Sequence, residues 1–117
     1  MPFIKETFQL AATDADVLAA PSRLTSIPAD GVLTIECSAT QGNPTNNGQL
    51  TIQLPGGDTP VENVIIPQNG FSTSDSVIHD DTALQFQFSV AQGGHVGISY
   101  TETGTVTAVL FIVTLEF

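Results

Sequence analysis

The sequence predicts an all-β protein, an antiparallel β-sandwich of jelly-roll type with about six to eight strands and an irregular N-terminal arm. Apolar and polar side chains alternate with a period of two in several runs, which is the pattern of a strand with one buried face. Clusters of Gly, Pro and Asn separate these runs at intervals of about ten residues. No segment shows the period of a helix longer than about two turns.

The chain is expected to form one domain, in which residues 1–31 are an N-terminal strand or arm with an irregular segment and residues 32–117 form the sandwich core. Residues 3–10 alternate loosely, as a short strand or an extended arm would. Residues 11–31 contain small side chains, two prolines and no sustained period, and they leave room for one helical turn over residues 16–19. Because so long a connection is uncommon in a compact domain, we expect it to pack across a sheet edge or a neighbouring molecule.

The strands of the core follow from alternating or short apolar runs between turn signals. The pattern is clearest in residues 83–91, where Leu84, Phe86, Phe88 and Val90 alternate with glutamine and serine. The predicted core strands are residues 32–39, 49–54, 61–66, 83–91, 95–100 and 105–117, with a very short strand or bridge at residues 76–79.

The last of these runs, residues 105–117, is apolar on both of its faces. One row contains Val106, Ala108, Leu110, Ile112 and Thr114, and the other contains Val109, Phe111, Val113, Leu115 and Phe117. Its many β-branched residues argue against a helix. Both rows should therefore be covered. Either this run is a central strand buried within one domain, or the core covers one row and a neighbouring subunit or partner covers the other.

The second possibility predicts a contact surface and a homo-oligomer, most simply a cyclic trimer. The residues predicted to form this contact surface are Val109, Phe111, Val113, Leu115, Phe117, Phe3 and Phe8.

The charge of the chain excludes two classes of partner. Twelve acidic residues face only two basic ones, Lys5 and Arg23, which gives a formal net charge of −10. A nucleic-acid-binding protein needs several basic residues on one face, and an anionic membrane surface would repel this chain. The N-terminus has no basic segment followed by a long apolar run, so we expect no signal peptide and synthesis in a cytoplasm.

No recognisable catalytic motif is present, and no catalytic residue or cofactor is predicted. Cys37 lies in the apolar row of its strand and is expected to be a buried small hydrophobe. His95 follows two glycines and is expected to be a hydrogen-bonding corner residue, while His79 lies in no motif. The loop residues Asp75, Asp80, Asp81 and Asp58 could supply oxygen ligands to Ca²⁺, but the spacing of a calcium loop is missing and a solvated acidic loop is preferred.

A carbohydrate-binding module is an alternative, because small acidic sandwiches can present aromatic rings to sugars. The chain has no Trp and one Tyr. Only Phe71 and Tyr100 are candidates for exposed aromatic side chains, which would make a poor platform for a sugar ring.

Three segments resemble a known group of proteins. They are DADVLAAPSRLTSIPADGVLTIECSAT, LPGGDTPVENVIIP and VAQGGHVGISYTETGTV. They are similar to the small β-sandwich and jelly-roll proteins that decorate or cement bacteriophage capsids. This resemblance implies a non-enzymatic virion structural protein that binds a capsid or other virion protein through apolar and backbone contacts and stabilises the shell. A tail or receptor-binding appendage module is the alternative within the virion.

Overall fold

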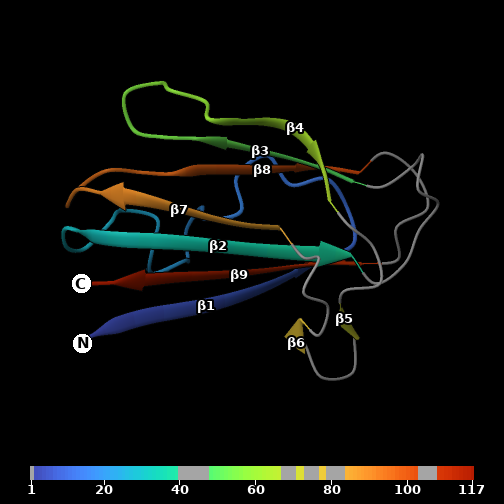
Figure 1. Ribbon diagram of the computed structural model, residues 1–117, viewed down its shortest axis with the longest axis horizontal. Coiled ribbons are helices and arrows are strands. Elements are labelled where there is room, and N and C mark those ends of the chain that lie inside the picture. Colours follow the sequence, from blue (N-terminus) through green and yellow to red (C-terminus); the bar gives the residue numbers. More distant parts are fainter. Residues whose placement is uncertain (1, 40–47, 67–70, 73–76, 79–83, 103–107) are drawn as a thin grey trace.

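The computed structural model describes residues 2–39, 48–66, 71–72, 77–78, 84–102 and 108–117, and all the regular structure of these residues is β (Figure 1). One antiparallel sheet has four strands in the order β1 (Phe3–Leu10), β9 (Val109–Glu116), β2 (Gly31–Ala39) and β7 (Leu84–Val90). A second antiparallel sheet has three strands in the order β4 (Val61–Ile65), β3 (Gln49–Gln53) and β8 (Gly97–Thr101). A small hairpin consists of β5 (Phe71–Ser72) and β6 (Val77–Ile78).

The alternation of apolar and polar residues predicted most of these strands correctly. The predicted runs 3–10, 32–39, 49–54, 61–66 and 83–91 correspond to β1, β2, β3, β4 and β7 to within one residue at either end. The two-residue strand β6 falls within the predicted short strand at 76–79. The final strand begins at Val109, and residues 105–107 of its predicted range lie outside the described residues.

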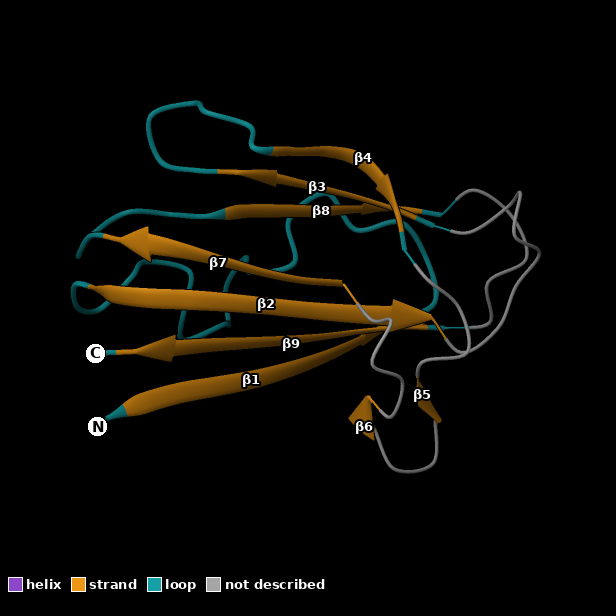
Figure 2. Cartoon of the chain, in the orientation of Figure 1, coloured by secondary structure: helices purple, strands orange, loops and turns teal. Residues whose placement is uncertain are grey.

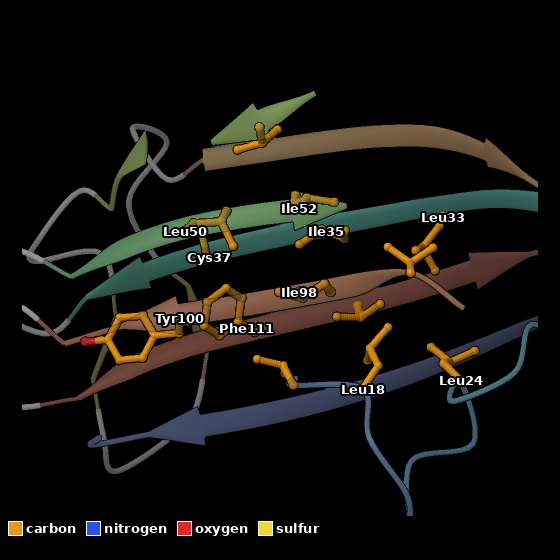
Figure 3. Close-up of a cluster of buried hydrophobic side chains, with 14 of the residues drawn as sticks. Leu18, Leu24, Leu33, Ile35, Cys37, Leu50, Ile52, Ile98, Tyr100 and Phe111 are labelled. Atoms are coloured by element: carbon orange, nitrogen blue, oxygen red, sulfur yellow. The ribbon is translucent and has the colours of Figure 1, made fainter. Parts of the chain in front are cut away.

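The core lies between the two sheets, which face each other (Figure 3). Leu33, Ile35 and Cys37 of β2 point towards the second sheet, from which Leu50 and Ile52 of β3 point back. In the same layer, the rings of Phe111 and Tyr100 meet edge to face, with centroids 6.1 Å apart and planes at 70°. The relative exposure of these seven side chains is 0%.

The segment between β1 and β2 extends the second sheet along the edge of β8 and contains no helix (Figure 2). Asp14 N donates to Tyr100 O at 2.9 Å, Tyr100 N donates to Asp14 O at 2.8 Å, and Val17 N donates to Ile98 O at 2.8 Å. The segment also contributes buried side chains to the core, namely Val17, Leu18, Leu24 and Ile27. The expectation that it packs across a sheet edge is confirmed.

The helical turn predicted over residues 16–19 is wrong. This stretch forms turns instead, with Ala19 N donating to Asp16 O at 3.2 Å. Pro21 has no N–H that could donate to the Val17 carbonyl four residues earlier, so an α-helix cannot continue through this stretch.

β9 is an inner strand of its sheet, as predicted for a run that is apolar on both faces. The row of side chains predicted to contact another subunit, however, faces the core. Val109, Phe111, Val113 and Leu115 all have 0% exposure and belong to the main core cluster. The opposite row is covered as well at its first residues, where Ala108 and Leu110 are buried and pack with Ile112 in a second, smaller cluster. The prediction that these four core residues contact another subunit is therefore corrected, because their own chain encloses them.

Within the described residues, no helix is long and apolar enough to cross a membrane.

Candidate contact surface

The two ends of the chain lie at the same end of the four-stranded sheet (Figure 1). Strand residues at this end have exposed large apolar side chains. Phe3 is 63% exposed and Val32 is 42% exposed. Both pair with Glu116 of β9, so the carboxylate lies between these two apolar side chains on the outer face of the sheet. Phe117, 39% exposed, follows directly at the end of β9, but alternation places its side chain on the same side of the sheet as Leu115. We call Phe3, Val32 and Glu116, which share the outer face, the terminal patch.

The backbone holds the terminal patch in a fixed register. Phe117 N donates to Pro2 O at 3.0 Å, which continues the pairing of β1 with β9 beyond the last strand residues. On the other side, β2 begins at Gly31, where an added Cβ would lie 2.1 Å from Glu116 O. Only a residue without a side chain fits this close approach. The glycine thus allows Val32 to follow immediately beside the patch carboxylate.

Only part of the predicted contact surface remains available to a partner. Phe3 and Phe117 are exposed, Phe8 is half-buried and packs against the core, and the four predicted residues of β9 are enclosed. Val32 and Glu116 were missed. Val32 occupies an outward position of an alternating strand, which the sequence does show, but its shared neighbour Glu116 emerges only from the register.

His95 connects the start of the β8 region to the irregular segment. Its Nδ1 bonds to the Thr25 carbonyl oxygen, and its Nε2 lies 2.9 Å from Asp16 Oδ2. Because both partners are acceptors, the doubly protonated ring satisfies both bonds. The bond to Thr25 raises the pKa of His95, partial burial opposes this, and Asp16 raises it further. The predicted role as a hydrogen-bonding corner residue is confirmed.

Cys37 and Tyr100 are both enclosed in the core. Burial raises the pKa of the Cys37 thiol to about 12, so the reactive thiolate is disfavoured. Tyr100 has 0% exposure, and its hydroxyl donates to Glu102 Oε2 at 2.9 Å. Burial, followed by the Glu102 carboxylate, raises the pKa of Tyr100. The expectation that Tyr100 could present its ring to a sugar is wrong, and the side chain of Phe71 lies outside the described residues.

A groove of about 410 Å³ lies on the second sheet and has a mainly polar lining. Its polar residues are Thr51, Gln53, Thr59, Glu62, Asn63 and Ser99. The pairing of β3 with β4 shifts register here, and Asn63 adopts a left-handed conformation with φ of 51°. Asn63 N donates to Thr51 Oγ1 at 3.1 Å. These groups can hydrogen-bond a polar ligand, but the groove lining includes no aromatic side chain for stacking.

Most of the residues of the predicted acidic site are not among those that the structure describes. Asp75, His79, Asp80 and Asp81 lie outside the described residues, whereas Asp58 is in the turn between β3 and β4, where its carbonyl oxygen accepts from Leu54 N at 2.7 Å. Among the residues that the structure describes, no group of three or more His, Cys, Asp or Glu side chains is placed to hold a metal ion.

No protein-family model matches the sequence, and no curated protein matches it either.

Proposed function

We propose that the two sheets form a β-sandwich with jelly-roll connectivity, in which the segment containing Asp14 and Val17 takes the place of a strand. A jelly roll is a long antiparallel hairpin rolled over on itself, so that early strands pair with late ones in both sheets. The support is the pairing of β1 with β9, of the Asp14 segment with β8, of β2 with β7 and of β3 with β4. In this order, the pairs lead from the open ends of such a hairpin towards its closed turn.

The function that fits best is that of a non-enzymatic structural component of a virus particle, a capsid decoration or cement protein made in the host cytoplasm. The observation on which this depends is the terminal patch, because exposed apolar side chains gathered at one place mark sites of protein contact. The resemblance of the sequence to bacteriophage decoration proteins supplies the identity of the partner, a capsid or other virion protein. Jelly rolls are frequent in viral capsids, but the fold alone does not assign the role.

Among the described residues, the side chains most suited to catalysis, Cys37 and His95, have structural tasks, which supports a non-enzymatic role. The Cys37 thiol is enclosed and its pKa is raised, and both ring nitrogens of His95 are occupied by Thr25 and Asp16. A catalytic base needs a free nitrogen within reach of the proton that it removes. His95 would have to abandon a structural hydrogen bond to act in this way.

Carbohydrate binding is the second candidate function, and the polar groove on the second sheet is the feature that favours it. Hydroxyl, amide and carboxylate groups from Thr51, Gln53 and Glu62 are suited to sugar hydroxyls. A tail or receptor-binding appendage would combine this groove with a place in the virion. A glycan array separates the two functions, since a decoration protein that acts through the terminal patch requires no glycan.

The proposed function is tested on virus particles from the source that encodes the chain. Antibodies raised against the purified protein, used for gold labelling in electron microscopy, should label sites distributed over the shell. Label confined to one vertex or to a tail would identify an appendage. Particles without label would refute a virion role.

Binding through the terminal patch is tested with purified shells from which the protein has been removed. Phe3→Asp should abolish re-binding, because a charge at the centre of an apolar contact must be desolvated without a partner. The matched control is Ile65→Asp on β4, since Ile65 is 54% exposed and does not belong to the patch. Equal loss of binding in both variants, or full binding by Phe3→Asp, would contradict the proposed surface.

A further inference from the structure

Three of the four outermost edges of the two sheets are protected. An unprotected edge strand presents free N–H and C=O groups and pairs readily with another strand. At the β1 edge, the Lys5 carbonyl oxygen accepts from Arg23 Nη2 at 3.2 Å. At the β8 edge, Asp14 and Val17 take up the backbone groups of Tyr100 and Ile98.

The β4 edge is protected by its shape. Its pairing with β3 contains a register shift, Asn63 adopts a left-handed conformation, and the exposed Glu62 adds a charge. Bulges, left-handed residues and charges of this kind prevent edge-to-edge pairing.

Among the described residues, the fourth edge, β7, has none of these protections. Its sequence, LQFQFSV, contains no charged residue, proline or glycine, and it pairs with β2 in an unbroken register. Leu84, Phe86 and Phe88 are only half-buried, whereas their partners on β2 are 0% exposed. Apolar surface is therefore accessible along the open side of β7.

The pairing pattern shows which backbone groups of β7 are free. Pro2 O accepts from Phe117 N, while Lys5 O faces away from the sheet towards Arg23, so the even-numbered residues of β1 face β9. Hydrogen-bonding directions alternate along each strand, and the registers extend this alternation through β9 and β2 to β7. In β7, this alternation directs the N–H and C=O groups of Gln85, Gln87 and Ser89 away from β2, towards the open edge of the sheet. In the described part of the chain these groups have no partner.

We propose that β7 pairs with β7 of a second copy of this chain, antiparallel about a two-fold axis at Gln87. The strand sequence is nearly the same read in either direction about this residue, so Gln85 lies opposite Ser89 and Phe86 opposite Phe88 of the second copy. The outward backbone groups of the two strands then satisfy each other. Phe86 and Phe88 form the closer, non-hydrogen-bonded pairs, in which aromatic side chains interact across strands.

The charge distribution agrees with this choice of partner. Each copy has a formal charge of −10, yet β7 itself is uncharged, so copies repel each other at a distance without burying a charge at the contact. Raising the salt concentration from about 0.01 M to about 0.15 M shortens the screening length from about 30 Å to about 8 Å, which should strengthen the association. The dimer takes the place of the trimer expected from the β9 row, and it does not depend on the proposed virion role.

Sedimentation equilibrium of the full chain tests the dimer. With increasing protein concentration at about 0.15 M salt, we expect the mass to approach twice the 12.3 kDa of one chain, with weaker association at about 0.01 M. A monomer at every concentration, or a mass three times that of one chain, would overturn the proposal.

Substitutions at one position then identify the edge. Gln87→Pro removes an outward N–H and leaves the hydrogen bonds to β2 in place, so the dimer should weaken at least about tenfold. Gln87→Ala keeps that N–H and loses only the side-chain bond to Thr34 Oγ1, so its dimer should persist. Thr7→Pro makes the same backbone change at an outward position of the opposite edge and should also leave the dimer intact.

A second variant keeps the test decisive if Gln87→Pro does not fold. In the monomer, Gln87→Lys replaces an exposed side chain and loses its bond to Thr34 Oγ1, as Gln87→Ala does. In the dimer it also places two like charges opposite each other at the axis. Circular dichroism confirms that the variant is folded. A folded Gln87→Lys monomer supports the β7 contact, and a Gln87→Lys dimer as strong as the wild type overturns it.

Discussion

Replacing Phe111 tests whether the apolar row of β9 belongs to the core or to an interface. The side chain has 0% exposure and packs edge to face on Tyr100, with ring centroids 6.1 Å apart. Phe111→Ala should lower the free energy of unfolding by about 3–5 kcal/mol, which includes the cavity left behind. The lost aromatic pair alone accounts for about 0.5–1.5 kcal/mol of interaction. Because small domains have a net stability of about 5–15 kcal/mol, this is a large share of the total.

Urea denaturation followed by circular dichroism measures this loss, with Phe3→Ala as the matched control. Phe3 is also a phenylalanine in the four-stranded sheet but is 63% exposed, so its removal should change stability by no more than about 0.5 kcal/mol. Phe111→Asp should give an unfolded chain rather than a soluble, folded monomer. The core assignment would be refuted by a loss below about 1 kcal/mol for Phe111→Ala, or by a folded Phe111→Asp variant that differs from the wild type only in its association.

The remaining predictions concern a histidine, a glycine and the cysteine. The pKa of His95 is raised in the folded state, so its stabilising effect is complete below the unfolded value of about 6.5 and is lost as the pH rises through the folded pKa. The wild-type stability measured by urea denaturation should fall over this interval, and the same slope in His95→Gln would rule out His95 as its source. Gly31→Ala should lower the melting temperature by several degrees, because its Cβ would meet Glu116 O at 2.1 Å; an unchanged melting temperature would show that β2 can move aside. Cys37, with its pKa raised to about 12, should react with a thiol reagent at pH 8 only after unfolding, and fast labelling of the native protein would contradict its burial.

Strand positions could be predicted from the sequence because each strand is encoded by its own residues. The alternation in β7 and the turn residues on either side are local signals. The orientation of β9 could not be predicted in the same way, since both of its rows are apolar. Leu110 and Phe111 are equally suited to a core, and only the position of the second sheet decides which of them faces it.

The contact surface was only partly predictable for a related reason. Phe3 and Phe117 were recognised as apolar residues near the chain ends, but the pairing that places Val32 and Glu116 beside Phe3 joins distant parts of the sequence. The pairing of Asp14 with Tyr100 is similarly hidden, because the small side chains around Asp14 show no alternation. Register between distant strands depends on the assembled sheet rather than on either strand alone.

The position of β9 between β1 and β2 has a consequence for synthesis on the ribosome. The first strand of the chain finds its partner only when the last one has emerged, since Phe3 pairs with Glu116. Until then β1 and β2 have no common neighbour, and their apolar sides are exposed while translation continues. Completion of the four-stranded sheet therefore waits until β9 has left the ribosome, and nascent chains halted before Val109 should be recognised by chaperones or proteases as unfinished.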